Sequence, residues 1–228
     1  MAATAVVVLI ATYIFGYVTS YYRLKPSNQI TNMIYRVDPY DPRSNTSWVA
    51  LSEIYLGRGA TDGIAFFGDS NVEYGDWPRL LGRNDILNHG IAGDTTRGLL
   101  LRLRNGEPRG ARNMLLVGVN DMRSGITSSE SIANIEKIVA ILGPRNTVVI
   151  SPILTGHAER NAPVVAIIES ERALCRRLGC SFVDPNTVLS EGGALKPSLT
   201  MDGVHLTWGG YERLAPLISA ALAVPQPR

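Results

Sequence analysis

The chain lacks several features that would place it in a common functional class. Its 228 residues include only three histidines and two cysteines, and the histidines show no ligand spacing, so no zinc site is expected. The 22 Lys and Arg residues nearly balance the 20 Asp and Glu residues, without the clustered basic face of a nucleic-acid binder. No internal repeat or low-complexity tract is present. We therefore expect no metal, no cofactor and no nucleic-acid partner.

The composition that remains is that of a folded protein. Hydrophobic residues make up 45% of the chain and charged residues 18%, which is typical of a globular protein and not of a disordered one. A chain of this length can hold one domain with a continuous hydrophobic core, together with an appendage.

The appendage is expected at the N-terminus, where the first 22 residues carry no charged side chain. As a helix rising about 1.5 Å per residue, this stretch would span about 33 Å, close to the roughly 30 Å of a bilayer core. Three tyrosines near its end, next to Arg23 and Lys25, resemble an interfacial belt. We predict a transmembrane anchor over residues 1–22. A cleaved signal peptide is the alternative, although no basic n-region or clear cleavage site supports it.

Two signals about the side of the membrane point in opposite directions. Arg23, Lys25 and Arg36 follow the hydrophobic stretch, which favours a cytoplasmic domain under the positive-inside rule. Cys175 and Cys180 flank a glycine turn that could bring them within disulfide range. A disulfide would indicate an oxidising compartment, and two reduced thiols are the alternative. The interpretation we adopt is a membrane-anchored protein with its folded domain on the extracytoplasmic side.

A linker and a short lead-in helix are predicted over residues 23–60. The linker is rich in Pro, Asn, Asp and Ser. Ser47 is the expected cap of the helix, with Trp48, Leu51 and Ile54 on one side.

An alternating pattern of strands and helices then predicts one domain over residues 61–224. Short apolar runs indicate buried strands at residues 64–67, 86–88, 114–119, 148–153 and 182–183. Amphipathic segments indicate helices at residues 96–104, 128–142, 162–178 and 210–222. Such alternation predicts an α/β fold, with a mostly parallel sheet of about five strands covered by helices on both faces.

Four short polar segments stand at positions where this fold would gather them. They are residues 68–71 (Gly-Asp-Ser-Asn), 90–94 (Gly-Ile-Ala-Gly-Asp), 118–121 (Gly-Val-Asn-Asp) and 202–205 (Asp-Gly-Val-His). The first three follow the first three strands, and ligands of open parallel sheets bind beyond the carboxyl ends of the strands. The fourth precedes the last helix and can return to the same edge. We expect the four segments to form one site.

These segments contain the groups needed for nucleophilic catalysis. Ser70 needs a base to remove its proton, and His205 is suited to that role. Asp202 can accept from the imidazole Nδ1 hydrogen and leave Nε2 facing Ser70. Attack on an ester carbonyl creates an oxyanion, for which three donors are available. They are the backbone N–H groups of Ser70 and Gly93 and the side-chain amide of Asn120.

With these motifs the chain resembles the GDSL or SGNH hydrolase superfamily of serine esterases and lipases. The resemblance covers residues 62–222 and is closest to the small branch with arylesterases, multifunctional thioesterases and platelet-activating-factor acetylhydrolases. It implies a three-layer, flavodoxin-like α/β/α sandwich. It also implies the family's four invariant roles for Ser70, Gly93, Asn120 and His205, with Asp202 completing the triad.

Three further residues are predicted to contact substrate. Asn71 stands where the family usually has an apolar residue after the nucleophile, so a polar contact near the acyl pocket is expected. Trp77 could wall that pocket, with core packing as the alternative. His157 follows the fourth strand and could line the pocket, with an exposed loop as the alternative. His89 is expected to be structural.

The sequence thus predicts a membrane-anchored serine esterase acting on a small-molecule or glycan ester. The expected reaction is hydrolysis of a short-acyl or acetyl carboxylic ester through an acyl-enzyme on Ser70, with a thioester as a lesser possibility. Acyl transfer to a cell-envelope glycan and a catalytically silent binding module are the alternatives.

Overall fold

The computed structural model of the chain describes Tyr13 and residues 41–223. The chain divides into two compact units, Met1–Ser44 and Asn45–Arg228. In the first unit the described part holds Tyr13 and the short 3-10 helix η1 (Pro42–Ser44). Apart from Tyr13, the predicted anchor at residues 1–22 lies outside the described residues, as does most of the linker. No helix within the described ranges is long and apolar enough to cross a membrane.

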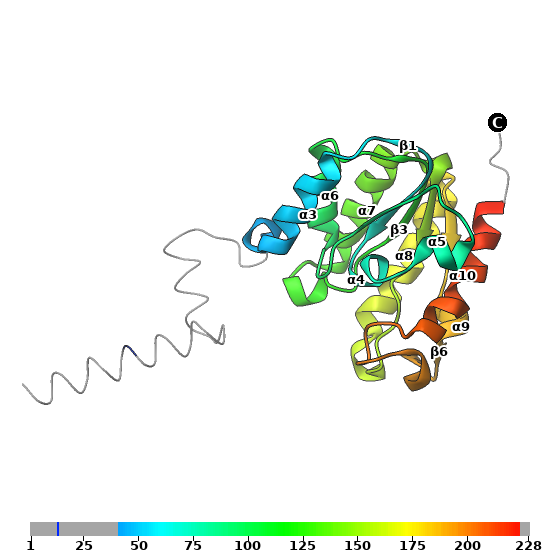
Figure 1. Ribbon diagram of the computed structural model, residues 1–228. Helices are drawn as coiled ribbons and strands as arrows, with labels where there is room; N and C mark the ends of the chain where they lie inside the picture. Colours follow the sequence, from blue (N-terminus) through cyan, green and yellow to red (C-terminus); the bar gives the residue numbers. More distant parts are fainter. Residues whose placement is uncertain (1–12, 14–40, 224–228) are drawn as a thin grey trace, which may run out of the picture. The chain divides into compact units, whose positions relative to one another are not determined.

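The second unit is built on a five-stranded sheet in which every neighbouring pair is parallel (Figure 1). The strand order is β2-β1-β3-β4-β5. The strands are β1 (Thr61–Gly68), β2 (Ile86–Gly90), β3 (Gly110–Leu116), β4 (Thr147–Ile150) and β5 (Ser181–Val183). This sheet confirms the predicted α/β class and its five strands.

Eight α-helices of the described chain connect and flank the strands. They are α3 (Thr46–Leu56), α4 (Ser70–Glu73), α5 (Trp77–Leu81), α6 (Thr96–Arg104), α7 (Ser128–Leu142), α8 (Ala162–Leu178), α9 (Asn186–Leu189) and α10 (Trp208–Ala223). Short 3-10 helices lie at η2 (Met122–Ser124), η3 (Pro144–Asn146), η4 (Ala158–Arg160) and η5 (Pro197–Leu199), and β6 (Ser190–Glu191) pairs with β7 (Ala194–Leu195) in a small hairpin.

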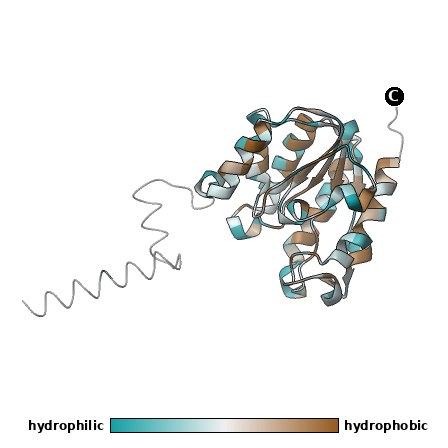
Figure 2. Cartoon of the chain, in the orientation of Figure 1, coloured by the Kyte–Doolittle hydropathy of each residue, from teal (hydrophilic) through white to brown (hydrophobic). Residues whose placement is uncertain are grey.

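Alternate residues of each strand enter two separate cores, as the two-residue repeat of a strand requires. In β1, Phe66 enters a core with Trp77 and the buried face of α10. Its neighbours Ala65 and Phe67 enter a second core with α6, α7 and α8. Hydrophobic residues accordingly colour much of the sheet and many turns of the surrounding helices brown (Figure 2). The result is the predicted three-layer α/β/α sandwich.

Helix α3 differs from its prediction in two respects. Asn45, not Ser47, is its N-cap, and the Asn45 side chain accepts from the backbone N–H of Ser47 at 3.0 Å. The buried face is Trp48, Ser52 and Tyr55, whereas Ile54 is 55% exposed. A helix turns about 100° per residue, so steps of four and three residues keep one direction, while two steps of three drift away from it.

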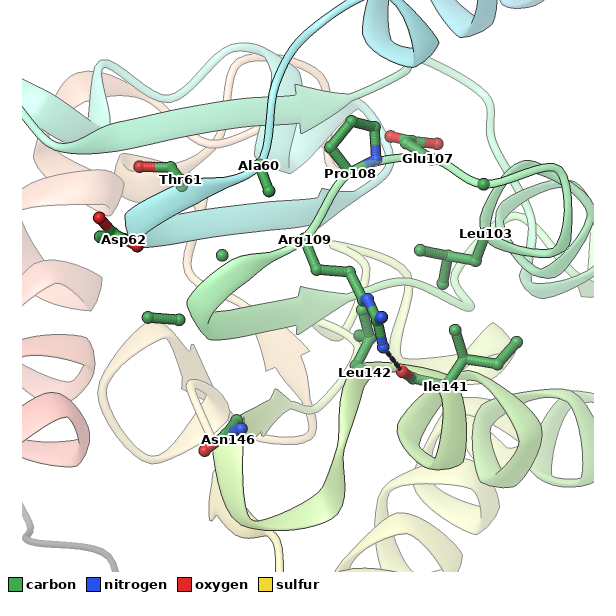
Figure 3. Close-up of a pocket in the computed structure, with 13 residues that line it drawn as sticks. Ala60, Thr61, Asp62, Leu103, Glu107, Pro108, Arg109, Ile141, Leu142 and Asn146 are labelled. Atoms are coloured by element: carbon green, nitrogen blue, oxygen red, sulfur yellow. Dashed lines mark hydrogen bonds between the residues drawn. The ribbon is translucent and has the colours of Figure 1, made fainter.

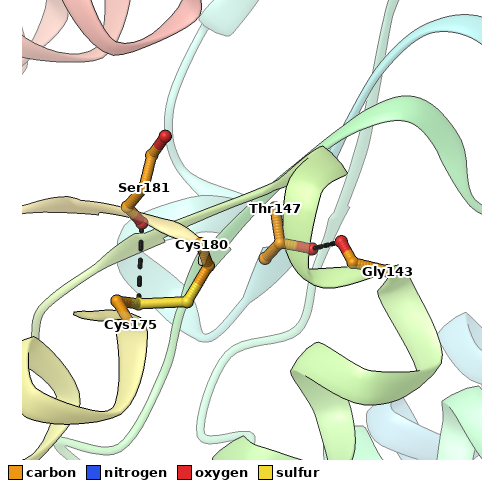
Figure 4. Close-up of a disulfide and its surroundings, with 5 residues drawn as sticks. All are labelled: Gly143, Thr147, Cys175, Cys180 and Ser181. Carbon is orange, nitrogen blue, oxygen red and sulfur yellow. Dashed lines mark hydrogen bonds between the residues drawn. A yellow bond between two sulfur atoms is a disulfide. The ribbon is translucent and has the colours of Figure 1, made fainter. Parts of the chain in front are cut away.

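The two cysteines of the chain are disulfide-bonded to each other (Figure 4). Helix α8 ends at Gly179, which has φ +79° and donates its N–H to the carbonyl of Cys175 at 2.8 Å. This left-handed turn, which glycine adopts without a Cβ clash, reverses the chain so that the Cα atoms of Cys175 and Cys180 lie 4.6 Å apart. Of the two alternatives for these thiols, the paired one is therefore found.

Candidate active site

Three neighbouring strands bring three of the polar segments to one edge of the sheet. Gly68, the last residue of β1, pairs with Gly90 at the end of β2 and with Leu116 at the end of β3. Ser70 follows β1 directly, and the turn with Gly93 and the loop with Asn120 follow the other two strands. The expected gathering at the carboxyl ends of the strands is therefore found.

The fourth segment closes the site through a chain of hydrogen bonds. His205 Nε2 lies 3.0 Å from Ser70 Oγ, and His205 Nδ1 lies 2.6 Å from Asp202 Oδ2. Ser70 is 4% exposed, while the side chains of His205 and Asp202 are 28% and 51% exposed. Hydrogen bonds from the backbone and the side chain of His205 lower the pKa of Asp202 to about 2. The carboxylate is thus ionised wherever the protein is folded at ordinary pH.

The loop that carries this pair is shaped by its own backbone. Asp202 Oδ1 accepts from the backbone N–H of Val204 at 3.0 Å and of His205 at 2.8 Å. Gly203, with φ +86°, turns the chain between them, and its carbonyl accepts from Gly156 N–H at 2.7 Å. One carboxylate therefore both shapes the loop and contacts the imidazole.

Asn71 joins the serine helix to the histidine loop. It is 3% exposed, its amide nitrogen donates to the Val204 carbonyl at 3.3 Å, and its amide oxygen accepts from Leu206 N–H at 3.3 Å. Its own carbonyl accepts from the Tyr211 hydroxyl at 3.0 Å. Both ends of the amide are thus occupied, and the structure does not turn Asn71 toward a substrate. The expected polar contact is corrected to a bridge within the protein.

A tight turn presents the backbone N–H of Gly93. Within residues 91–94, Ile91 N–H donates to the Gly68 carbonyl at 3.0 Å, Ala92 N–H donates to Glu73 Oε2, and Asp94 N–H donates to the Ile91 carbonyl at 2.9 Å. Gly93, at φ +78°, is exposed, and its N–H has no acceptor among the described residues. Three of the four N–H groups hold the turn, and the fourth is left for a ligand.

The other two predicted donors are also free to donate. Ser70 is the first residue of α4, so its N–H has no partner within the helix. Asn120 donates one amide hydrogen to the Asp94 carbonyl at 3.0 Å, and a side-chain amide carries two. The bond to Asp94 thus orients the amide and leaves its second hydrogen unused.

Each of the three donor segments contains a buried aspartate. Asp69, Asp94 and Asp121 are 2%, 1% and 0% exposed, and burial raises the pKa of all three. For Asp69, whose hydrogen bond from Asn71 N–H opposes the rise, the pKa is about 7. Asp121 accepts from Thr96 and Ser131, and Asp94 accepts from Trp48, Thr95 and Arg102. These contacts support the loops from within the protein.

The remaining predicted residues lie in different surroundings. Trp77 is fully buried, stacks on Phe66 at 4.4 Å between ring centroids, and donates to the Val72 carbonyl. This burial corrects the expected substrate contact in favour of core packing. His157 has a half-exposed side chain beside Gly203 of the histidine loop, so its contact with substrate stays a prediction. His89 is fully buried, with Nδ1 2.9 Å from Glu107 Oε1.

Two residues shortly after the serine also lie at this site. From the sequence, Tyr74 was expected either to wall the acyl pocket or to pack in the core, while Glu73 was not singled out. The Tyr74 ring is 51% exposed and lies 5.4 Å from the His205 ring. Glu73 is the acceptor for Ala92 N–H. Their positions three and four residues after the serine were the available signal. Within the described part of the chain, no three His, Cys, Asp or Glu side chains are grouped to hold a metal ion.

A cavity of about 600 Å³ lies at the opposite end of the strands (Figure 3). It is lined by Thr61 and Gly110, the first residues of β1 and β3, and by Arg109, whose guanidinium donates to the Ile141 carbonyl. It is therefore separate from the edge that carries Ser70.

The comparisons with known proteins concern the same part of the chain. The model of the GDSL-like lipase/acylhydrolase family matches residues 56–213. The platelet-activating factor acetylhydrolase IB subunit alpha2 proteins of Rattus norvegicus and Homo sapiens are each 30% identical to the chain over 167 residues, covering 66% of the chain and 72% of the relative.

Solved structures resemble the fold. A putative platelet activating factor from Streptococcus pneumonia has a TM-score of 0.68 at 24% identity, covering 86% of this chain and 99% of the other. A putative acylhydrolase from Bacteroides fragilis has a TM-score of 0.64 at 23% identity, covering 78% and 96%. A catalytic mutant of an acetylxylan esterase from Geobacillus stearothermophilus has a TM-score of 0.61 at 17% identity, covering 75% and 98%.

Proposed function

Because the chain belongs to the GDSL-like lipase/acylhydrolase family and is a carboxylic ester hydrolase, we propose that it cleaves short-acyl esters through an acyl-enzyme on Ser70. The observation that carries the proposal is the continuous line from Ser70 Oγ to His205 Nε2 at 3.0 Å and from His205 Nδ1 to Asp202 at 2.6 Å. It joins a nucleophile, a base and an orienting carboxylate in the order that acyl transfer needs.

In the first half of the reaction, Ser70 Oγ attacks the ester carbonyl while His205 Nε2 takes the hydroxyl proton. Asp202, ionised above pH about 2, keeps the other imidazole hydrogen on Nδ1 and stabilises the imidazolium that forms. The tetrahedral oxyanion accepts from Ser70 N–H, Gly93 N–H and the second amide hydrogen of Asn120. When the intermediate collapses, His205 returns the proton to the departing alcohol and the acyl group stays on Ser70.

In the second half, water replaces the alcohol. His205 takes a proton from water, the resulting hydroxide attacks the acyl carbonyl, and the same three donors receive the second oxyanion. Collapse breaks the bond to Ser70 Oγ, which recovers its proton from His205, and releases the carboxylic acid. The serine and histidine thus end the cycle as they began it.

An acetyl ester is the substrate class we favour. The named relatives that are 30% identical to the chain are acetylhydrolases. An acetyl group also needs less space beside the serine than a longer acyl chain does. The tilted, half-exposed ring of Tyr74 beside His205 offers an apolar wall for one part of the ester.

We also propose that the catalytic unit works outside the cytoplasm. The Cys175–Cys180 disulfide supports an oxidising compartment, since cytosolic thiols are usually kept reduced. The uncharged first 22 residues support attachment to a membrane.

The deciding experiment compares the full chain with its Ser70→Ala variant on nitrophenyl acetate and on longer acyl esters. We expect kcat to fall by about a millionfold, as when the nucleophile of a triad is removed. Ser170→Ala is the matched control, because Ser170 is a partly exposed residue of α8 whose hydroxyl donates to the Ala166 carbonyl. A fluorophosphonate should label the parent and the control but not Ser70→Ala. Undiminished hydrolysis by Ser70→Ala would refute the proposal, and an unlabelled, inactive parent would favour a silent binding module.

A further inference from the structure

We propose that Trp48, on helix α3, is a positioning residue for the oxyanion donor Gly93 and acts through Asp94. The inference rests on the proposed function of the serine site. Most of α3 precedes residues 56–213, which match the family model. Helix α3 nevertheless packs on the catalytic unit, where Trp48 and Tyr55 form a small core with Ile91 and Leu101.

Every polar group of Asp94, the residue after Gly93, is hydrogen-bonded within the protein. Its carboxylate Oδ1 accepts from Trp48 Nε1 at 3.0 Å and from Thr95 N–H at 2.9 Å, while Oδ2 accepts from Arg102 at 2.9 Å. Its backbone N–H donates to Ile91, and its carbonyl accepts from Asn120 at 3.0 Å. Two of the predicted oxyanion donors, Gly93 and Asn120, therefore take their positions from this one residue.

The indole is the only one of these carboxylate donors that comes from outside the segment between β2 and β3. Thr95 and Arg102 are neighbours of Asp94 in sequence and move with it, whereas Trp48 lies 46 residues away. Trp48 is 5% exposed, so water does not compete for the bond. The indole hydrogen bond thus ties the turn to a separate element of the fold.

The fold leaves a gap of the right size for this contact. A Cβ at Gly98 would lie 2.1 Å from Asp94 Oδ1 and 3.1 Å from Trp48 Nε1. Alanine is the better helix former, yet at this position in α6 it would push the carboxylate away from the indole. The absence of a side chain at Gly98 is what allows Asp94 and Trp48 to meet.

A buried network of charged side chains also stabilises the Asp94 carboxylate. Arg102 pairs with Asp94 and also with Glu107, and all three side chains are fully buried. Glu107 in turn lies 2.9 Å from His89 Nδ1. Because a buried charge that loses a partner is strongly destabilised, Asp94 has few alternative positions. We infer that the indole hydrogen bond stabilises the position of Asp94 in which Gly93 N–H is free to donate.

The first arm of the test measures kinetics on the full chain. Trp48→Phe keeps an aromatic ring in the core but removes the indole N–H together with part of the ring volume. We expect kcat on nitrophenyl acetate to fall about tenfold, a part of the 10² to 10³ lost when a whole oxyanion donor is removed, with KM changed less than about twofold. Gly98→Ala, whose Cβ would displace Asp94 Oδ1 and also crowd Trp48 Nε1, should lower kcat in the same way.

Tyr55→Phe is the matched control. It removes a buried hydrogen bond from the same helix to the last residue of β2, Tyr55 Oη to the Gly90 carbonyl at 2.9 Å, but does not touch Asp94. We expect it to lower the melting temperature while leaving kcat unchanged. A merely structural role for Trp48 would leave kcat unchanged in both variants.

The second arm needs no activity and measures amide hydrogen exchange at Asp94 and Thr95, whose N–H groups are bonded in the turn. Exchange should become about tenfold faster in Trp48→Phe and stay unchanged in Tyr55→Phe. If the parent were inactive, the proposed function would fail, but the exchange measurement would still test whether Trp48 positions the turn. Equal exchange in the two variants, or equal kcat in an active protein, overturns the role of Trp48.

Discussion

The two sides of the candidate site are built in different ways. On the oxyanion side, the donors follow three neighbouring strands and are supported by carboxylates that are at most 2% exposed. On the acid–base side, Asp202 and His205 stand on a loop near the surface, with side chains 51% and 28% exposed. The first side is supported by buried groups from several elements of the fold, while the second is exposed to solvent and shaped by hydrogen bonds within a few residues.

This difference matches the demands of the two tasks. Donors to an oxyanion are effective when they are oriented in advance and need no rearrangement during the reaction. A base must exchange protons with water in every cycle, which an exposed imidazole can do. We infer that substitutions on the acid–base side act through proton position, and those on the oxyanion side through rigidity.

Of the substitutions that compare the two sides, the largest effect is expected on the acid–base side, from Asp202→Asn. The amide oxygen can still accept from Val204 N–H and His205 N–H, so the amide nitrogen then faces His205 Nδ1. The imidazole must accept there and carry its hydrogen on Nε2, where Ser70 needs an acceptor. We expect kcat to fall about 10⁴-fold, measured by steady-state hydrolysis, with little change in melting temperature. A fall of less than about tenfold would contradict this role.

A smaller effect is expected on the oxyanion side, from Asn120→Ala. The substitution removes one donor and the bond to the Asp94 carbonyl, so kcat should fall about 10² to 10³-fold with little change in KM. Asn113→Ala is the control, because Asn113 is a buried amide on β3 that donates to Leu142 away from the site. The control should lower stability and leave kcat intact. A larger change in KM than in kcat for Asn120→Ala would argue against oxyanion binding.

The smallest effect concerns stability and pH, through Asp69 beside the nucleophile. Burial raises its pKa to about 7 in the folded protein, against about 3.9 in an unfolded chain. Between these values the unfolded chain has released a proton that the folded protein keeps, so the free energy of unfolding falls as the pH rises. Asp69→Asn removes this pH-dependent fall in the free energy of unfolding, and its amide oxygen can still accept from Asn71 N–H.

The measurement for Asp69 is the melting temperature of parent and variant at pH 5 and pH 8. We expect the variant to gain several degrees relative to the parent between the two values. Asp76→Asn, at an exposed helix N-cap, should show a constant difference. If the melting temperature of Asp69→Asn relative to the parent fell between pH 5 and pH 8, the burial argument would be contradicted.

Much of the fold could be predicted because its signals are local. Helices α6, α7 and α8 begin and end where the apolar period and the capping residues indicate. Strand β3 differs, since it runs from Gly110 to Leu116 and not over residues 114–119. Its first residues pair through their backbones and have no apolar pattern, while the apolar residues after Leu116 belong to the loop. Strand pairing depends on neighbours more than on propensity.

The candidate site could be predicted only in part, for a related reason. The proximity of Ser70, His205 and Asp202 followed from motif order and strand ends. The bond from Trp48 to Asp94 spans 46 residues, and no local pattern indicates it. Trp77 and Asn71 follow the serine closely, but whether such side chains turn inward depends on α10 and the histidine loop, which lie far along the sequence.

The bridge made by Asn71 has a consequence for how the enzyme matures during synthesis. Its two side-chain hydrogen bonds reach residues 133 and 135 positions later in the chain. Under the proposed mechanism, the nucleophile and all three donors therefore leave the ribosome long before His205, the base that would activate Ser70. In a nascent or truncated chain Ser70 lacks its base. We expect the serine to become reactive only when the loop with His205 packs on Asn71.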